Sequence, residues 1–274
     1  MNRLKRFLLI HLPLAIILLF ALFPYMWGFI SSITPEGEMY VDGLRYFPRN
    51  PTGENYVRLF SRINFLENLK DSVLVATFSM LFGLVFSVTA SYSFSRFRFR
   101  GRRFLLLQFL VINMFPVVLL LIPLFVIFSR LGIMDTYLAL VLAYATFTIP
   151  FSTWMMTSFF AAIPQQLDEA AMIDGCSRIG ALVRVVFPIA LPGITATGIY
   201  IFITSWNEFV FASVLTSRDV RTIPIALQNM VGEYQIEWGL LTAGGVVSAI
   251  PVLILFFFIQ KQLIAGMTAG AVKG

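Results

Sequence analysis

Long apolar stretches recur six times along the chain and are separated by shorter polar stretches. Each apolar stretch reaches the roughly 20 residues that an α-helix needs to cross the hydrocarbon core of a bilayer. Glu208, in the fifth stretch, is the only charged residue within them. The pattern predicts an all-α, polytopic membrane protein with six transmembrane helices in a single transmembrane domain, residues 1–274. We expect the spans at about 7–30, 72–94, 104–128, 137–160, 194–214 and 240–259.

The first apolar stretch follows three basic residues, Arg3, Lys5 and Arg6. A secretory signal begins in the same way, but its apolar part is only about 7–15 residues long and ends in small residues. Here the apolar run continues through Pro24 and Trp27 without such a cleavage site. We therefore interpret it as a retained first span.

Composition supports this class and excludes several others. The chain is 58% hydrophobic and 12% charged, whereas soluble domains are about 25% charged. It contains one cysteine, Cys176, and one histidine, His11. A disulfide framework, a thiolate metal cluster and a histidine-rich metal site are therefore excluded, and we expect no metal and no catalytic residue in this chain.

The distribution of charge predicts the orientation. With six spans and a cytoplasmic N-terminus, the cytoplasmic segments carry twelve Lys and Arg residues and the external segments carry eight. The densest cluster is the loop Ser95–Arg103, with five arginines, and such loops favour the cytoplasmic side. We expect both termini to be cytoplasmic. A patch for nucleic acid or anionic lipid is the alternative explanation of this loop.

The predicted cytoplasmic loop 163–188 is the most informative polar segment. Pro164 suits the first turn of a helix, and Asp168 and Glu169 suit its positive N-terminal end. Asp174-Gly175 should end that helix, because glycine tolerates the left-handed conformation. An apolar i, i+3, i+4, i+7 stripe then predicts a second helix that ends at Pro188. Two short helices joined by a bend suit insertion into a groove of another protein.

The residues of this loop resemble the EAA loop of ABC importer permeases. The family pattern is E-A-A, three residues, G, nine residues and I-x-L-P. This chain has Glu169-Ala170-Ala171, then Gly175, then Val185-x-Phe187-Pro188. The two departures, Val185 and Phe187, remain apolar. The resemblance implies the type I ABC importer permease fold, with a coupling loop made by Glu169, Ala170, Ala171, Asp174, Gly175 and Pro188.

Further segments are similar to MalG-type permeases, the smaller of two permeases in maltose-type sugar importers. These are the arginine loop, the Phe115-Pro116 and Pro123-Leu124 pairs, Trp206-Asn207-Glu208-Phe209, and the end Gly270–Gly274. The likeness extends over essentially the whole chain. It implies import of a sugar or oligosaccharide across the bacterial or archaeal cytoplasmic (inner) membrane.

The resemblance also implies the partners of this subunit. They are a second, larger permease, two copies of a cytoplasmic ABC ATPase, and an extracytoplasmic sugar-binding protein. The sequence has no G-x-x-x-x-G-K-[ST] phosphate-binding loop, so we expect the ATPase to bind ATP and Mg. Carbohydrate and membrane lipid, and no nucleic acid, complete the expected contacts. In the family the first EAA helix binds a cleft on the ATPase, and the C-terminal tail (here Val272, Lys273 and Gly274) contacts the ATPase pair.

Individual polar residues in and near the spans are candidates for other roles. Asn113, Asn207 and Glu208 could contact sugar along the translocation path, or could bond to neighbouring helices. In the external loop 215–239, Gly232, Glu233 and Tyr234 are candidates for contact with the binding protein, and the alternative is an ordinary connector. Pro116, Pro123 and Pro150 should kink the third and fourth spans.

Two other functions are less compatible with the sequence. An ion-coupled secondary transporter normally has several charged residues in its spans and internal repeats, and this sequence has one acid and no repeat. An intramembrane protease is less compatible still, because Ser248 has only His11 as a candidate base.

Overall fold

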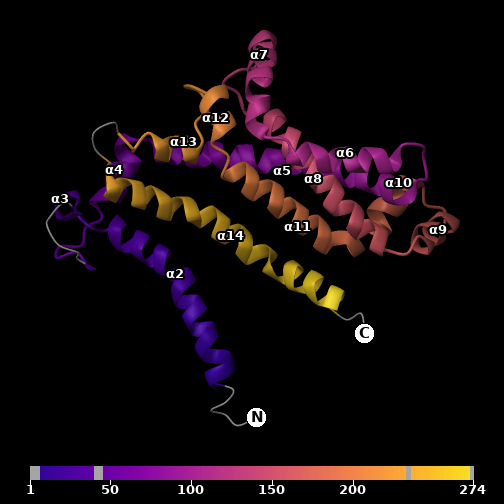
Figure 1. Ribbon diagram of the computed structural model, residues 1–274, viewed down its shortest axis with the longest axis horizontal. Coiled ribbons are helices and arrows are strands. Elements are labelled where there is room, and N and C mark those ends of the chain that lie inside the picture. Colours follow the sequence, from indigo (N-terminus) through magenta and orange to yellow (C-terminus); the bar gives the residue numbers. More distant parts are fainter. Residues whose placement is uncertain (1–6, 40–45, 233–235, 272–274) are drawn as a thin grey trace. The chain divides into compact units, whose positions relative to one another are not determined.

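The computed structural model describes residues 7–39, 46–232 and 236–271, and the backbone of this part is almost entirely helical (Figure 1). Val231 and Ile236 form an isolated antiparallel pair. The helical elements are η1 (Phe7–His11), α2 (Leu12–Ser32), α3 (Glu36–Met39), α4 (Glu54–Arg62), α5 (Phe65–Arg96), α6 (Arg102–Met114), η2 (Val117–Leu120), α7 (Leu121–Leu131), α8 (Tyr137–Ala162), α9 (Gln166–Ile173), α10 (Arg178–Ala181), η3 (Leu182–Val186), α11 (Phe187–Trp206), α12 (Val210–Leu215), α13 (Ile223–Gln228) and α14 (Trp238–Ala271).

Five helical stretches in the described residues are long and apolar enough to cross a membrane, by length and composition. They correspond to η1 with α2, to α5, to α8, to α10 through α11, and to the first part of α14. The bent pair formed by α6 and η2–α7 makes a sixth span if it is counted as one. The all-α membrane fold predicted from the apolar pattern is thus the observed fold.

The third apolar stretch is not one straight helix. The chain turns by 97° between α6 and the helix that continues through α7 (Figure 1). Phe115 is extended with ψ 135°, and Pro116 follows it with ψ 112°. Proline disfavours the helical conformation in the residue before it and has no N–H to donate. The expected kink at Pro116 is therefore a complete break, whereas Pro150 lies within the continuous helix α8.

The fifth helix also differs from the expected segment 194–214. It begins at Phe187 and ends at Trp206, so Glu208 lies outside it. The Asn207 amide donates to the carbonyl of Ile203 at 2.9 Å, and a new short helix, α12, begins at Val210. Polar side chains that bond to backbone groups compete with helix continuation, which accounts for the break.

The chain divides into two compact units. The first contains the residues up to Glu67 and Ala226–Pro251, and the second contains Asn68–Ile225 and the chain from Val252. The helices α5, α13 and α14 pass from one unit to the other. Each unit is described by itself below.

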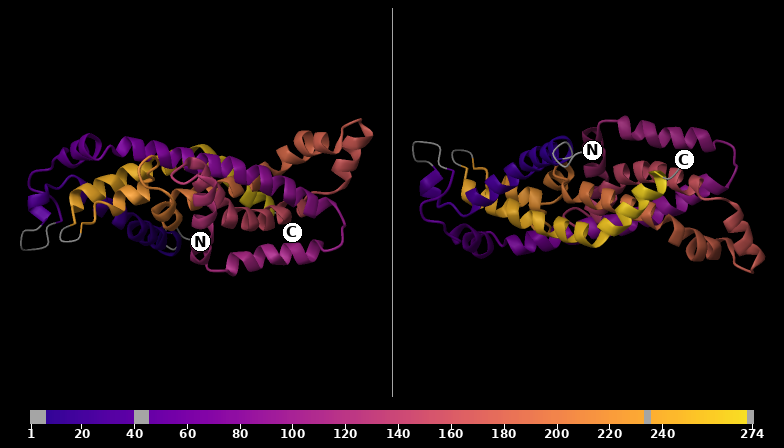
Figure 2. Two further views of the ribbon diagram at one scale, coloured as in Figure 1. Left: turned by 90° about the horizontal axis from the view of Figure 1, so that it is seen from above. Right: turned by 90° about the horizontal axis from the view of Figure 1, so that it is seen from below.

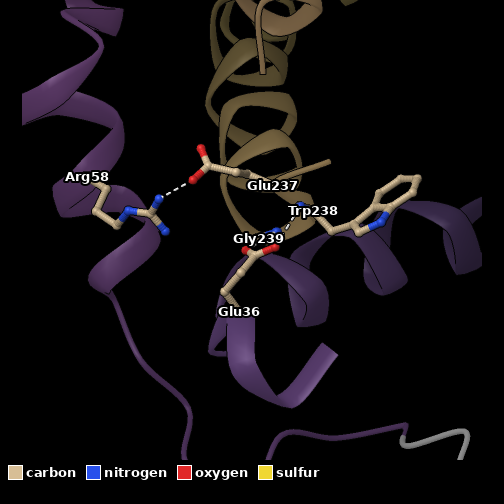
Figure 3. A network of polar contacts seen from close by, with 5 residues as sticks. All are labelled: Glu36, Arg58, Glu237, Trp238 and Gly239. Carbon is tan, nitrogen blue, oxygen red and sulfur yellow. Dashed lines mark hydrogen bonds and ion pairs between the residues drawn. The ribbon is translucent and has the colours of Figure 1, made fainter. Parts of the chain in front are cut away.

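In the first unit, polar side chains join the ends of several helices (Figure 3). The Glu36 carboxylate accepts N–H groups of Trp238 at 3.1 Å and Gly239 at 3.2 Å, at the start of α14. Arg58 of α4 pairs with Glu237. The Asn55 amide donates to the carbonyls of Ser32 and Thr34, both at 2.9 Å, where α2 ends. Unpaired backbone groups at helix ends are thus satisfied by neighbouring elements.

The short helix α4 packs against other parts of the first unit. Leu59 of α4 is completely buried, and the hydroxyl of Tyr56 lies 2.7 Å from that of Ser32. The apolar face of α4 is therefore used at least in part for packing within the first unit.

In the second unit, small residues let long helices approach closely. A Cβ atom on Gly193 of α11 would lie 2.5 Å from the Phe159 ring of α8. A Cβ on Gly83 of α5 would lie 2.9 Å from Ile201 of α11. Such small residues are typical of helix interfaces in membranes. They hold α5, α8 and α11 together and place the ends of α5 and α8 next to the loop that carries α9.

Candidate coupling site

The expected bend in loop 163–188 is present as two short helices, α9 and α10, with Gly175 between them. Gly175 has φ +90°, in the left-handed region. Its N–H donates to the carbonyl of Met172 at 3.1 Å, and the N–H of Cys176 donates to the carbonyl of Ala171 at 2.9 Å. This is the Schellman arrangement that ends a helix with a glycine.

The second short helix begins immediately after this bend. Ser177 is extended, and its hydroxyl accepts the N–H of Gly180 at 3.1 Å. Serine in this position satisfies a free N–H at the start of a helix. The turn is therefore determined by local chemistry at both helix ends, and both views of Figure 2 show the α9–α10 segment projecting from the ends of α5 and α8.

The second helix does not end at Pro188 as expected. After α10 the chain makes one π-helical turn, η3, and continues directly into α11. Pro188 is exposed in the first turn of α11, where a missing N–H is tolerated. The coupling segment is thus continuous with the fifth span, and a movement of α10 would be passed to α11 without a flexible joint.

A buried acid fixes α9 to the end of α5. Asp168 is 5% exposed, and its Oδ2 lies 2.9 Å from Nε of Arg96. The Tyr92 hydroxyl donates to Oδ1 of Asp168 at 2.6 Å. Nη1 of Arg96 donates to the carbonyl of Phe160 at 3.0 Å, in the last turn of α8. One ion pair and two hydrogen bonds therefore join α9, α5 and α8.

A second contact holds α10. The guanidinium of Arg178 lies 5.1 Å from the centre of the Phe97 ring, just after α5. Phe97 in turn packs edge-on against Tyr92, and Tyr92 packs edge-on against Phe160. Cation–π and edge-to-face contacts of this kind each add a modest, orientation-dependent attraction. Together they make α9 and α10 an extension of the α5 and α8 ends.

The candidate residues of the loop lie on different sides of α9. Glu169, Ala170, Asp174 and Gly175 are exposed, whereas Ala171 is buried against the protein's own chain. Two large apolar side chains beside them are also exposed, Ile173 (86%) and Ile179 (74%). The projecting surface therefore combines acidic, small and apolar residues, which is suited to a protein partner rather than to chemistry.

Sequence reasoning did not assign a role in this site to Tyr92, and it treated Arg96 only as part of the arginine loop and Asp168 only as an acid suited to a helix start. Asp168 and Ala171 are three residues apart and both buried, so they share the inner face of α9. The position of Asp168 on the same helix face as Ala171 was the sequence feature that could have predicted its buried role.

The candidate translocation residues make local contacts. The Asn113 amide donates to the carbonyl of Phe109 at 2.7 Å within α6, and Asn207, directly after α11, donates to the carbonyl of Ile203 in that helix. The Glu208 carboxylate accepts the N–H groups of Phe211 at 2.9 Å and Ala212 at 3.2 Å, at the start of α12. Their proposed roles in sugar transport stay predictions.

The other candidates are only partly within the described structure. Gly232 is exposed and directly follows Val231, which pairs with Ile236. Glu233 and Tyr234 lie outside the described residues, as do Val272, Lys273 and Gly274. Within the described part of the chain, no three His, Cys, Asp or Glu side chains lie together in a way that could hold a metal ion.

Comparison with known families identifies this architecture. Residues 79–269 match the family described as "Binding-protein-dependent transport system inner membrane component". The chain belongs to this family. As an inner membrane component it is a transport permease, so the family decides against the intramembrane protease and the ion-coupled transporter as interpretations of the sequence.

Individual relatives extend the match over nearly the whole chain. The sulfoquinovosyl glycerol transport system permease protein SmoH of Agrobacterium fabrum is 38% identical over 261 residues, covering 95% of this chain and 92% of SmoH. The trehalose/maltose transport system permease protein MalG of Thermococcus litoralis is 36% identical over 275 residues, covering 99% and 98%. The resemblance to sugar-importer permeases that the loop indicated is thereby confirmed.

Two solved structures contain a chain with the same fold. A chain of a bacterial ABC transporter involved in the import of the acidic polysaccharide alginate superposes with a TM-score of 0.79 at 25% identity, covering 95% of this chain and 98% of that one. A second, from the alginate transporter in complex with an alginate pentasaccharide-bound periplasmic protein, has a TM-score of 0.67 at 17% identity, covering 93% of each chain. The type I permease fold is therefore the fold of this chain.

Proposed function

We propose that this inner membrane component is the permease subunit of an ATP-driven importer for a sugar or oligosaccharide that an extracytoplasmic binding protein delivers. The named relatives transport sulfoquinovosyl glycerol and trehalose or maltose, and a third, DasC of Streptomyces coelicolor, belongs to a diacetylchitobiose uptake system. Glycosides are common to all three. The substrate class is thus supported by relatives that each cover over nine-tenths of the chain.

The proposed assembly contains a second, larger permease and two copies of an ATPase that binds ATP and Mg. This chain lacks a phosphate-binding loop, so a separate subunit must supply the energy. The large exposed apolar surfaces of α2, with Phe20 85% exposed, suit lipid or another membrane subunit. In this assembly the chain itself is not an enzyme.

The observation that carries the proposal is the projecting α9–Gly175–α10 bend and its attachment to α5 and α8. In the proposed mechanism the ATPase binds the exposed face near Glu169, Ala170 and Gly175. Its closure moves α9, and the buried Asp168–Arg96 pair passes that movement to the end of α5. The continuous η3–α11 segment passes it to the fifth span. By linkage, the transport state must bias ATP-driven closure equally.

The proposed orientation places the arginine loop, the α9–α10 bend and both termini in the cytoplasm of a bacterial or archaeal cell. The contacts of Arg96 with Asp168 and of Phe97 with Arg178 place the start of the arginine loop and the bend together. They therefore lie on one side of the membrane, and the positive-inside rule assigns that side to the cytoplasm. A cysteine introduced at Arg100 should be labelled by a membrane-impermeant maleimide only in inverted vesicles. Labelling in intact cells would reverse the orientation.

Replacement of Gly175 by Asp tests the coupling role. We expect the assembled transporter to reach the membrane but to lose uptake of labelled sugar in proteoliposomes by tenfold or more, together with the stimulation of ATP hydrolysis by loaded binding protein. Gly132→Asp is the matched control, because Gly132 also has a left-handed backbone, φ +67°, with nothing within 4 Å of an added Cβ. Normal coupled uptake by Gly175→Asp would refute the assignment. Uptake that required an ion gradient instead of ATP would refute the importer itself.

A further inference from the structure

A groove of about 210 Å³ lies between α6 and α8, within the second unit. Arg103 and Ser158 line one part of it, and leucines of α6 together with Trp154 and Thr157 of α8 line the rest. Nothing in the coupling mechanism uses this groove. Its lining residues are Arg103, Leu106, Leu107, Leu110, Trp154, Thr157 and Ser158.

The polar and apolar residues of the groove are separated along the helices. Arg103 is the second residue of α6, and Ser158 is in the last turns of α8, so both lie near the end where the arginine loop and α9 are attached. Leu106 and Leu110 follow Arg103 in α6. At 1.5 Å per residue, Leu110 is about 10 Å further along the helix. The groove thus has one basic, hydroxyl-bearing end and one apolar length.

The charge around the polar end is uniformly positive. Arg98, Arg100 and Arg102 lie in the same loop and first turn, and residues 95–114 contain no acid. The buried acid of α9, Asp168, is already paired with Arg96. A bound anion would therefore meet no carboxylate from residues 95–114 competing for these cations.

We propose that this groove binds one anionic phospholipid of the cytoplasmic leaflet. The guanidinium of Arg103 pairs with the lipid phosphate, and the exposed hydroxyl of Ser158 donates to it. One acyl chain lies along Leu106, Leu107 and Leu110. The indole of Trp154 also lines the groove. Tryptophan favours the boundary between lipid headgroups and hydrocarbon. Basic pockets between transmembrane helices on the cytoplasmic side are suited to such headgroups.

The length of the groove decides between a lipid and a free anion. A phosphate ion would use Arg103 and Ser158 only, and the three leucines would stay exposed to lipid tails without a defined neighbour. A phospholipid satisfies both ends at once. It would also fill the space beside α6, the shorter arm of the broken span, and so brace that arm against α8.

Photo-crosslinking in the assembled transporter tests the proposal. The full complex is reconstituted in nanodiscs with phosphatidylglycerol that carries a diazirine on one acyl chain, and crosslinked peptides are identified by mass spectrometry. We expect crosslinks concentrated on 106–110 and on Trp154, and at least fivefold fewer with the matching phosphatidylcholine probe. Crosslinks spread evenly over exposed spans such as α2, or equal labelling by both probes, would overturn the proposal.

Two variants separate this site from general attraction to the loop. Arg103→Gln should lower the phosphatidylglycerol crosslinks about fivefold, the effect of one basic residue near an anionic surface. Arg100→Gln removes the same charge from the loop but does not line the groove, and should change them less than twofold. Equal losses in both variants would show that the loop attracts lipid without a groove site.

Leu107→Trp fills the apolar part of the groove without changing its charge and should also abolish the crosslinks.

Inorganic phosphate at 50 mM should not displace the lipid probe. Displacement of the probe by phosphate at equal ionic strength would assign the site to a free anion. A crosslink from a photoreactive residue at position 107 to the second permease would show that a protein occupies the groove, and would overturn the lipid assignment. Because Arg103→Gln changes one exposed side chain, it keeps the test decisive even if Leu107→Trp does not assemble.

Discussion

Arg96 at the end of α5 and Asp168 in α9 form a buried ion pair, with Nε and Oδ2 2.9 Å apart and both side chains less than one-tenth exposed. The Tyr92 hydroxyl also donates to the acid, and Nη1 of Arg96 donates to the carbonyl of Phe160, whereas Nη2 of Arg96 is buried without a hydrogen-bond partner among the described residues. A buried pair of this kind costs more to break than its net contribution to stability, since the remaining charge stays desolvated. The pair therefore fixes α9 to the end of α5.

Removal of one partner should detach α9. Arg96→Gln leaves the Asp168 carboxylate buried and unpaired, at a cost of about 3–5 kcal/mol. We expect the amides of α9 to exchange hydrogen roughly 100-fold faster or more, as measured by mass spectrometry on the purified transporter. The control is Arg98→Gln, which removes an exposed arginine of the same loop.

The double variant Arg96→Met/Asp168→Leu distinguishes coupling from simple loss of packing. Two apolar side chains leave no unpaired charge in the site. The α9 amides of the double variant should therefore regain much of the hydrogen-exchange protection that is lost in Arg96→Gln. ATP-driven uptake should recover with it. Protection that stays low in the double variant would show that the ion pair is not what holds α9.

Asp135, in the loop between α7 and α8, should make the neighbouring segment 217–220 sensitive to acid. Burial raises the pKa of this carboxyl, but hydrogen bonds from Arg218, Ser217 and Asp219 outweigh burial and hold the pKa well below its ordinary value. A depressed pKa stabilises the folded loop above the ordinary carboxyl pKa of about 4, and this stabilisation is lost as the pH falls through the lower folded value. Amides of 217–220 should therefore be protected at neutral pH and lose protection progressively below about pH 4.

Asp135→Asn isolates the charge in this effect. Asparagine tolerates the left-handed backbone of this residue, φ +59°, so the loop conformation is retained. We expect the variant to lose protection at 217–220 at neutral pH, by about 1–3 kcal/mol, and to show no further loss on acidification. An unchanged acid response in Asp135→Asn would mean that another carboxyl is responsible.

Glu208 should act first as a cap for α12. Its carboxylate accepts two N–H groups at the start of that helix, so Glu208→Ala should expose both and destabilise α12 by about 1 kcal/mol. Glu208→Gln keeps an acceptor and should cost less. Hydrogen exchange at 211–212 measures this effect, and sugar uptake measures the alternative role. A raised KM in Glu208→Gln with unchanged exchange would show contact with substrate.

Much of the coupling loop followed from local sequence. Gly175 ends α9 as expected, whereas Pro164 lies two residues before α9 begins at Gln166 and not in its first turn, and the capping role of Ser177 was found only in the structure. Pro188 was misjudged, because a proline in the first turn of α11 is as compatible with helix continuation as with helix ending. The pattern alone does not distinguish the two.

The sequence by itself determined the membrane class, the number of apolar stretches and the projecting bend, because hydrophobic length and the preferences of glycine, proline and serine act locally. Only the tertiary structure decided how far the chain turns at Pro116, 97°, and which residue pairs with Asp168. Those depend on which helix faces meet, and small residues such as Gly193 set how closely they approach. An acid three residues into a helix looks the same in the sequence whether it faces water or an arginine of another span.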